Sequence, residues 1–421
     1  MSNLDLKKEI GVIGKKAFEA KYELQKLSAK EKQDALLFVA DKLVSSSKEI
    51  IEANEKDLKH GKENGMHEGL LDRLMLNEER IEGIALGIRQ VAGLPDPIGK
   101  TIDSWTLENG LKISKVSVPL GVIGIIYESR PNVTADAFSL TFMAGNAVIL
   151  KGGSDAINSN LAITEVIRQA LFEKGLNPDF IQLIPFTDRA AVGELLTLRE
   201  YVDVVIPRGG AGLIRMVCEN SKIPVIETGS GNCHIYVDEF ADVSKAIPII
   251  INAKTQRIGV CNAAESLIVH ENIKDKFLPL LSDAMNEKKV ELRADDESIG
   301  LLPGAKKATE EDFGTEYLDY IMSVKTVKSV EEAISHINRY NTGHSESIIT
   351  ENKQNADKFL KGVDAACVYV NASTRFTDGF QFGFGAEIGI STQKLHARGP
   401  MGLSELTSYK YEIIGEGQIR G

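Results

Sequence analysis

The sequence predicts an α/β protein built around a parallel β-sheet that is covered on both faces. Three observations support this fold class. Between Pro119 and Glu227, short apolar runs alternate with amphipathic helical segments. The apolar runs lack polar alternation, as expected for strands buried on both faces. The chain has 421 residues, of which 43% are hydrophobic and 26% charged, so it is long enough for two or three domains with their own cores.

The first 93 residues predict helices. The segment Ser28–Glu31 has the pattern of a capping box. Apolar residues follow at helical spacing, and Gly61 is the predicted stop. These apolar residues are Leu36, Val39, Leu43 and Val44. A second amphipathic helix is predicted from Ile81, Ile84, Ala85, Ile88 and Val91.

The alternating region predicts strands joined by helices, as in dinucleotide-binding sheets, although no G-x-G-x-x-G occurs. The predicted strands are Val122–Tyr127, Ala147–Lys151, Phe180–Ile184, Val202–Pro207 and Ile223–Glu227. The predicted helices are Thr134–Ala144, Asn158–Lys174, Arg189–Leu198 and Ala211–Asn220. Residues 235–380 repeat the alternation less cleanly and predict a second α/β domain.

Two segments lie outside this pattern. Trp105–Val118 alternates in polarity around turn residues at Glu108–Gly110, which predicts a β-hairpin. Near the end of the chain, Ser408–Ile414 predicts a further strand.

Composition indicates a cytoplasmic soluble protein. The formal net charge of −11 repels nucleic acid and anionic membranes, so neither is an expected partner. The 4 cysteines form no C-x-x-C pair, which favours free thiols in a reducing compartment. The first 20 residues mix charges into every turn and predict no secretory signal.

The sharpest local feature is the segment Gln256–Ala264, which reads QRIGVCNAA. Its small residues predict a loop that leads into a helix, with Cys261 at the helix N-terminus. The positive end of a helix dipole stabilises a thiolate, the nucleophilic form of cysteine. The alternative is a buried structural cysteine. Cys233, in a polar turn beside His234, is the rival thiol.

Two charged residues close predicted strands. Glu227 precedes a glycine-rich turn at the edge where open α/β sheets bind ligands, so it is a candidate general base or acid. A solvated strand-end glutamate is the alternative. Lys151 is followed by Gly152, Gly153 and Ser154, a pattern suited to holding a phosphate or a ribose. An ordinary strand-exit turn explains the same residues equally well.

A second glycine-rich turn follows the strand Val202–Pro207. Gly209 and Gly210 allow close backbone approach, and the N-terminus of the next helix can bind pyrophosphate.

The order and separation of these features resemble the aldehyde dehydrogenase superfamily over nearly the whole chain. The positions of Lys151 and Glu227 relative to Cys261 match those of that family's cofactor lysine, general-base glutamate and nucleophile. The resemblance therefore implies that Cys261 is the nucleophile and that a nicotinamide cofactor binds.

The resemblance also implies a domain organisation. A Rossmann-type cofactor-binding domain would comprise residues 1–101 and 119–228, and an α/β catalytic domain residues 229–402. Residues 102–118 and 403–421 would form a small β oligomerisation arm. Because exposed strand edges are normally paired, a homodimer or a higher homo-oligomer is expected.

Further motifs look closer to one branch of the superfamily, the gamma-glutamyl phosphate reductases. These motifs are Glu128–Thr134 (ESRPNVT), Thr315–Leu318 (TEYL), Asn338–His344 (NRYNTGH) and His396–Leu403 (HARGPMGL). The resemblance implies NADPH-dependent reduction of L-glutamyl 5-phosphate to L-glutamate 5-semialdehyde and phosphate, in proline biosynthesis. Cys261 would attack the acyl phosphate and hold the acyl group as a thioester. A functional link to glutamate 5-kinase is also implied.

The oxygen of each tetrahedral stage needs hydrogen-bond donors. The resemblance implies the Cys261 backbone N–H and the Asn132 side chain, whereas alignment on the nearby proline puts Ser129 in the place of Asn132. In oxidising relatives the glutamate at Glu227 activates water. A reductase that releases phosphate needs no such water, so here Glu227 would manage protons or be a relic of ancestry.

The resemblance favours NADPH as the cofactor. NAD-preferring relatives often have an acidic residue three positions after the lysine, whereas this chain has Ser154. Ser154 does not repel a 2′-phosphate, and Lys151 can attract one. Glu316 matches the family's ribose-binding glutamate, although its surrounding motif differs.

Arginines are candidates to bind the anionic groups of the substrate, because a guanidinium grips carboxylate or phosphate in two places. Arg130 lies in the ESRPNVT motif, and Ser373 and Arg375 lie where relatives have a substrate anchor loop. The alternative for each arginine is a solvated residue or an internal ion pair. No histidine spacing suits a metal, so none is predicted.

Two other functions compete with this interpretation. An NAD(P)-dependent aldehyde dehydrogenase that oxidises a small aldehyde would use the same cysteine and give Glu227 a full role as base. A catalytically silent relative is the second alternative. Joint retention of Cys261, Lys151, Glu227 and Glu316 speaks against it.

Overall fold

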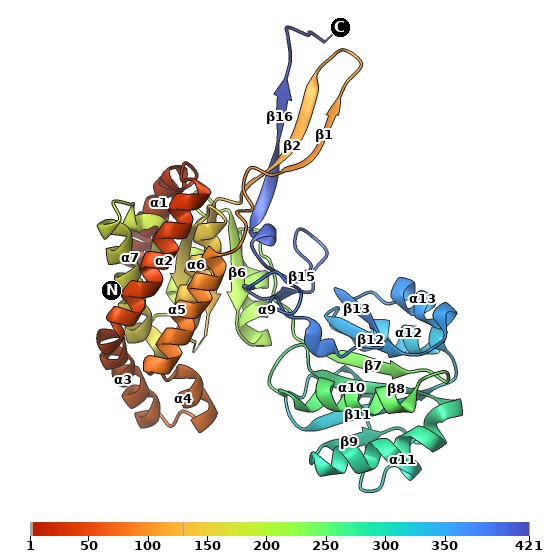
Figure 1. Ribbon diagram of the computed structural model, residues 1–421. Coiled ribbons are helices and arrows are strands. Elements are labelled where there is room, and N and C mark those ends of the chain that lie inside the picture. Colours follow the sequence, from red (N-terminus) through yellow and green to blue (C-terminus); the bar gives the residue numbers. More distant parts are fainter. Residues whose placement is uncertain (1–2, 129, 421) are drawn as a thin grey trace. The chain divides into compact units, whose positions relative to one another are not determined.

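The computed structural model describes residues 3–128 and 130–420, which form two compact units (Figure 1). Unit 1 comprises the described residues within Met1–Glu227, Phe384–Gly389 and Met401–Gly421. Unit 2 comprises Thr228–Gly383 and Ile390–Pro400.

Unit 1 contains a 4-stranded parallel sheet in the order β5-β4-β3-β6. Its strands are β3 (Val122–Tyr127), β4 (Ala147–Lys151), β5 (Ile181–Leu183) and β6 (Val204–Arg208). The accompanying helices are α6 (Asn132–Met143), α7 (Ile157–Glu173), α8 (Ala190–Leu195) and α9 (Ala211–Asn220). Almost every residue of the strands is buried, which confirms the predicted parallel sheet covered on both faces.

One predicted strand is reduced to a bridge. Within Ile223–Glu227, Val225 pairs with Val205 of β6, and two backbone hydrogen bonds join the segments. Pro224 lies in this segment and has no backbone N–H, so it interrupts a continuous ladder.

The N-terminal segment is helical, as predicted. Its helices are α1 (Asn3–Leu24), α2 (Ala29–Ser45), α3 (Ser47–Glu63), α4 (Glu68–Leu74) and α5 (Glu78–Ala92). The capping box of Ser28 and Glu31 is confirmed at the start of α2. The predicted stop at Gly61 is wrong, because Gly61 is buried inside α3. A Cβ there would lie 3.1 Å from Leu71, so the glycine allows close packing.

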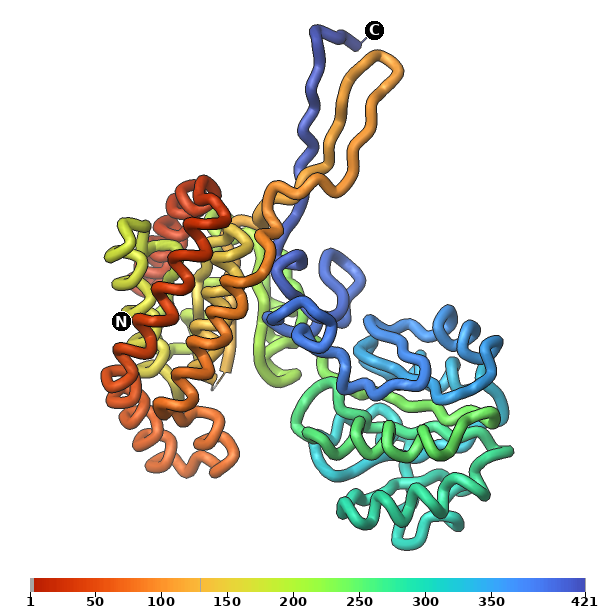
Figure 2. The backbone as a smooth tube through the Cα atoms, viewed as in Figure 1, coloured from red at the N-terminus to blue at the C-terminus, as the bar shows by residue number. Residues whose placement is uncertain are grey.

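A 3-stranded antiparallel sheet forms the arm of unit 1. Its strands are β1 (Thr101–Thr106), β2 (Lys112–Pro119) and β16 (Thr407–Ile414). β2 lies between the other two, so the chain's last strand runs beside a hairpin from its first third (Figure 2). The predicted hairpin and C-terminal strand are both confirmed.

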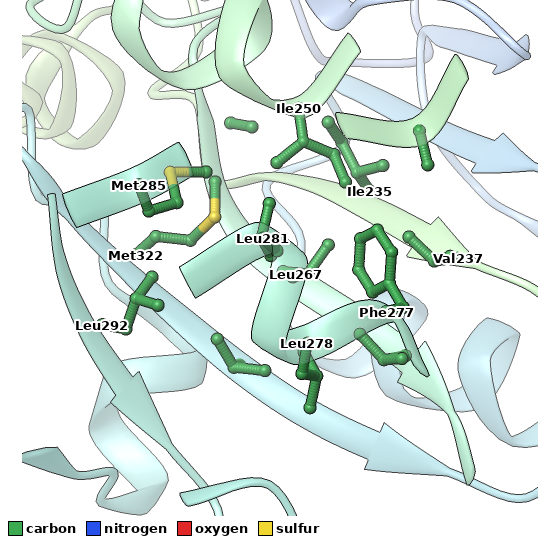
Figure 3. Packing of buried hydrophobic residues seen from close by; sticks show 14 of the residues in the cluster. Ile235, Val237, Ile250, Leu267, Phe277, Leu278, Leu281, Met285, Leu292 and Met322 are labelled. Atoms are coloured by element: carbon green, nitrogen blue, oxygen red, sulfur yellow. The ribbon is translucent and has the colours of Figure 1, made fainter. Parts of the chain in front are cut away.

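Unit 2 contains a 7-stranded parallel sheet in the order β10-β9-β11-β8-β7-β12-β13. Its strands are β7 (Cys233–Val237), β8 (Ala264–His270), β9 (Glu291–Ala294), β10 (Lys306–Lys307), β11 (Ile321–Val327), β12 (Ser345–Ile349) and β13 (Cys367–Val370). Its helices are α10 (Val243–Thr255), α11 (Glu271–Glu287), α12 (Val330–Tyr340) and α13 (Lys353–Gly362). Ile235 and Leu267 of the sheet pack with Ile250 of α10 and with Phe277 and Leu281 of α11 (Figure 3).

The boundary between the units differs from the predicted end of the second domain at residue 402. Phe384–Gly389 belongs to unit 1, where Ile388 and Gly389 exchange backbone hydrogen bonds with Met401. Gly385, at φ +81°, packs against Leu94 of the same unit and leaves no room for a side chain. Within unit 2, β14 (Ile390–Ser391) pairs with β15 (Gly399–Pro400).

A buried carboxylate joins the N-terminal helices to the sheet layer of unit 1. Asp57 of α3 is 2% exposed and lies at the start of α7. Its oxygens accept hydrogen bonds from the backbone N–H and the side chain of both Asn158 and Ser159, at 2.6–3.2 Å. Asp57 therefore satisfies the first N–H groups of α7, which have no partner within the helix.

Replacing Asp57 with alanine is expected to lower the free energy of unfolding by about 2 to 4 kcal/mol, because it removes the cap and leaves buried donors unpaired. Urea denaturation followed by circular dichroism would measure this change. Asp34→Ala is the control, since Asp34 forms an exposed ion pair with Lys30 of the same helix. Equal losses from both variants would contradict the assigned role of Asp57.

Candidate active site

Cys261 lies in a turn between α10 and β8 and is half-buried. The prediction that it begins a helix is wrong. The residues after it enter β8, a fully buried strand that pairs with β7 and β11. Burial between two parallel neighbours outweighs the helix propensity of the short Asn262–Ala264 stretch.

The backbone of Gly231 lies directly against the turn that carries Cys261. A Cβ on Gly231 would overlap the backbone carbonyl of Cys261, so only glycine fits at this position. The Cys233 thiol donates a hydrogen bond of 3.2 Å to the same carbonyl. Gly231, just before β7, and Cys233, its first residue, therefore support the position of the turn.

The other cysteines are poorer nucleophile candidates than Cys261. Burial raises the pKa of the Cys233 thiol well above its usual value, so this rival thiol is protonated at neutral pH. Burial, and then the nearby Glu227 carboxylate, raise the pKa of Cys218 to about 11. Burial also raises the pKa of Cys367.

Glu316 is linked to the Cys261 turn through Gly231, and all three residues belong to unit 2. Its Oε1 accepts a hydrogen bond of 2.7 Å from the N–H of Gly231, the residue whose backbone contacts Cys261. Burial raises the pKa of the half-buried Glu316 carboxyl, while the Gly231 N–H acts in the opposite direction. The structure thus brings together two residues that the sequence predicted to be functional.

Ser373 and Arg375 lie on a second segment beside the turn. The Ser373 hydroxyl accepts a hydrogen bond of 3.3 Å from the Arg375 backbone N–H. The Arg375 guanidinium donates to Gln256 and to Asn262. Burial lowers the pKa of Arg375, and Arg257 acts in the same direction. The predicted substrate residues of unit 2 therefore lie on a segment that is hydrogen-bonded to the two ends of the Cys261 loop.

A buried ion pair that the sequence analysis missed lies next to this site. Lys254 of α10 and Glu265 of β8 are both 0% exposed, and their charged groups are 2.5 Å apart. Burial raises the pKa of Glu265 to about 7 and lowers that of Lys254, while each charge opposes the shift of the other. The second oxygen of Glu265 accepts the N–H of Leu318, two residues after Glu316. In the sequence, this ion pair is indicated by a charged residue inside each of two apolar segments, Lys254 in α10 and Glu265 in β8.

Lys151 closes β4 in unit 1, and Gly153 and Ser154 follow it. The Lys151 ammonium group is 2.7 Å from the Gly152 carbonyl, and burial lowers its pKa. A Cβ on Gly152 would overlap the side chain of Asn160, so the turn is tightly packed. Among the described residues, the buried Nδ2 of Asn160 has no hydrogen-bond partner.

Gly209 and Gly210 lie between β6 and the start of α9, and a carboxylate lies against them. Glu128, at the end of β3, accepts a hydrogen bond of 2.9 Å from the Gly210 N–H. A Cβ on Gly209 would overlap the same carboxylate. β3 and β6 are parallel neighbours, so their carboxyl ends meet at the switch point of the sheet. This position of Glu128 was not predicted from the sequence.

The remaining predicted residues of unit 1 also follow strands of the parallel sheet. Asn132 begins α6, and its side-chain amide donates a hydrogen bond of 2.9 Å to Asp136. Burial raises the pKa of Asp136 to about 6, against the opposing effect of Asn132. Arg130 is exposed, and Glu227 is exposed next to Cys218. Ser129 lies outside the described residues.

The sequence matches the family model of the aldehyde dehydrogenase family over residues 5–311 and 301–411. The chain belongs to the aldehyde dehydrogenase family. Among curated members, the gamma-glutamyl phosphate reductase of Lachnospira eligens is 60% identical over 97% of this chain and 98% of its own length. That of Moorella thermoacetica is 57% identical over 98% and 99%.

Solved structures of the aldehyde dehydrogenase family have the same fold. The crystal structure of the gamma-glutamyl phosphate reductase of Thermotoga maritima is 54% identical and has a TM-score of 0.96, covering 97% of this chain and 99% of that one. An acetylating aldehyde dehydrogenase from Geobacillus thermoglucosidasius has a TM-score of 0.70 at 18% identity, with coverage of 100% and 99%. The predicted aldehyde dehydrogenase-like fold is confirmed.

Residues 3–128 and 130–420 contain no group of three or more His, Cys, Asp or Glu side chains placed to bind a metal ion. The helices in those ranges are too short or too polar to cross a membrane.

Gly231→Ala is expected to lower the nicotinamide-linked activity about 100-fold, because the added methyl group must displace the Cys261 turn by about 1 Å or more. The absorbance of reduced nicotinamide would follow the reaction. Gly300→Ala is the control in unit 2, since a Cβ there meets nothing within 4 Å. Full activity of Gly231→Ala would show that the close contact is not required.

Proposed function

We propose that this chain reduces L-glutamyl 5-phosphate to L-glutamate 5-semialdehyde and phosphate, with NADPH, as a step of proline biosynthesis. The main support is 54% to 60% identity, over almost the whole chain, to proteins named gamma-glutamyl phosphate reductase. The half-buried Cys261 on a tightly packed turn supplies the nucleophile that such a reaction needs.

The Cys261 thiolate attacks the acyl carbon of the substrate, and the bond to the phosphate oxygen breaks. Phosphate leaves, and the acyl group remains on Cys261 as a thioester. A nicotinamide cofactor, when bound, would supply the hydride that reduces this thioester to a thiohemiacetal. Cys261 then leaves as a thiolate when the thiohemiacetal collapses to the aldehyde.

Donors must stabilise the negative oxygen of both tetrahedral stages. The Cys261 backbone N–H and the Asn132 side chain are proposed for this role, with Ser129 as the alternative to Asn132. One Asn132 N–H already donates to Asp136, which orients the amide along its helix. Glu227 is proposed to manage protons, because a phosphate-releasing reductase needs no activated water.

The residues of unit 1 fit a dinucleotide phosphate. The switch point between β3 and β6 is where open α/β sheets bind such ligands, and α9 directs its N-terminus there. Gly209 and Gly210 would take a phosphate at this edge, which would replace the Glu128 carboxylate on the Gly210 N–H. Lys151, Gly153 and Ser154 would hold the ribose that carries the 2′-phosphate. In unit 2, Glu316 would bind the other ribose.

Arginines would bind the anionic groups of the substrate. Arg130 is exposed, and its guanidinium can grip a carboxylate or phosphate in two places. The Arg375 guanidinium has five N–H donors, and its bonds to Gln256 and Asn262 use two of them. Ser373 would add a hydroxyl beside Arg375.

The arm supports the proposal of a homo-oligomer. Its sheet ends on both sides in an edge strand, β1 and β16. Apolar side chains are exposed along it, including Trp105, Tyr411 and Ile413. Unpaired edges with exposed apolar groups are normally covered by another subunit. A functional link to glutamate 5-kinase, the source of the unstable substrate, is proposed with the reaction.

The reverse reaction tests the function. Purified protein with glutamate semialdehyde and NADP is expected to produce NADPH only when phosphate or arsenate is present, and Cys261→Ala is expected to produce none. Absorbance of the reduced nicotinamide is the measurement, and Cys218→Ala is the matched control. Oxidation without phosphate would instead favour an oxidising aldehyde dehydrogenase that acts on a small aldehyde.

Ser154→Glu is expected to weaken NADPH binding about tenfold or more, because a carboxylate three positions after Lys151 repels the 2′-phosphate. NADH binding should change little. Isothermal titration calorimetry with both cofactors would measure the two affinities. Ser45→Glu, an exposed change of equal charge in α2, is the control. An equal loss for NADPH and NADH would argue against a ribose site at Ser154.

A further inference from the structure

The loop that carries Cys261 is closed by one arginine. The loop begins at Gln256, directly after α10, and ends at Asn262, shortly before β8. The Arg375 Nε donates a hydrogen bond of 2.9 Å to Gln256 Oε1, and its Nη1 donates to Asn262 Oδ1. A single planar guanidinium therefore joins the two ends of the loop, with Cys261 between them.

The segment around Arg375 is itself fixed to the same loop. The Thr374 hydroxyl donates a hydrogen bond of 2.7 Å to the Asn262 carbonyl, and the Asn262 amide donates one of 2.8 Å to the Thr377 carbonyl. Asn262 and Thr374 are buried. These bonds fix the position of the guanidinium relative to Cys261.

A reactive cysteine needs nearby positive charge to hold its thiolate form. The sequence predicted that a helix N-terminus would supply this charge, but Cys261 lies in a turn and begins no helix. The Arg375 Nη1 donates to the side chain of Asn262, the residue that directly follows Cys261, so the guanidinium is held at the part of the loop that carries the thiol. A positive charge near a thiol favours its thiolate form.

We infer that Arg375 is a positioning residue that closes the Cys261 loop and supplies the positive charge that stabilises the nucleophilic thiolate. This inference rests on the proposed function only in taking Cys261 as the nucleophile. It is distinct from binding of the substrate by Arg375, because it acts before any substrate arrives.

Other charged and titratable groups also lie near the Cys261 loop. Arg257 and Asp378 both act on Arg375, with opposite signs, and Cys233 lies beside Cys261. Glu316 contacts Gly231, and the Lys254–Glu265 pair lies at the base of the loop. Among these groups Arg257 is the matched cation, because it lies on the loop itself but is exposed.

The test is the rate at which iodoacetamide alkylates Cys261, measured against pH by mass spectrometry of the Cys261 peptide. The assay uses the full chain without substrate or cofactor. In Arg375→Gln, the midpoint of the profile is expected to rise by about one pH unit, with about tenfold slower alkylation below both midpoints. Arg375→Lys should retain most of the effect, and Arg257→Gln should leave the midpoint nearly unchanged.

A second pair of variants leaves Arg375 intact, in case its replacement prevents folding. Gln256→Glu places a carboxylate against the guanidinium and neutralises its charge, so the midpoint should rise. Gln256→Ala removes the hydrogen bond without adding charge, so the midpoint should stay near its original value.

An unchanged midpoint in both Arg375→Gln and Gln256→Glu would overturn the inference, as would an equal rise in Arg257→Gln. If Arg375 only bound the substrate, Arg375→Gln would have a higher KM and an unchanged alkylation profile. If the proposed reaction itself is wrong, the phosphate-dependent assay fails while the alkylation profiles still respond to Arg375.

Discussion

The contact between the backbones of Gly231 and Cys261 is the constraint on which the site in unit 2 depends. It holds the segment before β7 against the turn before β8, two strands that are neighbours in the sheet. The Gly231 N–H is directed at Glu316, and the Cys233 thiol at the Cys261 carbonyl. A side chain at position 231 would separate these groups, so one glycine keeps Cys261, the candidate nucleophile, close to Glu316.

The fold was predictable where a residue pattern is local. α9 spans Ala211–Asn220 as predicted, and β3 and β4 also have their predicted bounds, because apolar runs and helical periodicity act over short distances. The wrong predictions concern segments whose conformation is determined by tertiary contacts. Gly61 remains helical because a neighbouring helix packs against it, and the residues after Cys261 become a strand because two strands flank them.

The candidate site was predictable in its residue types and less so in its electrostatics. Parallel strands bring their carboxyl ends to one edge of a sheet, so a lysine or glycine after each strand could be assigned from the sequence. The hydrogen-bond partners of those residues could not be assigned from the sequence. Glu128 binds Gly210, far along the chain, and Arg375 joins Gln256 to Asn262. Such pairings depend on strand order and loop conformation, which spacing in the sequence does not encode.

Positive charge near a thiol can come from a helix dipole or from a side chain, and these two sources differ in how they can be changed. A helix dipole is built into the backbone and cannot be changed without changing the fold. A guanidinium held by two side chains can be altered through those side chains while the fold persists. Within the part of the chain that the structure describes, Arg375 donates to the neutral side chains of Gln256 and Asn262, so these hydrogen bonds do not cancel its charge. The amide partners therefore hold the guanidinium in place without neutralising it, which is what the inferred stabilisation of the Cys261 thiolate requires.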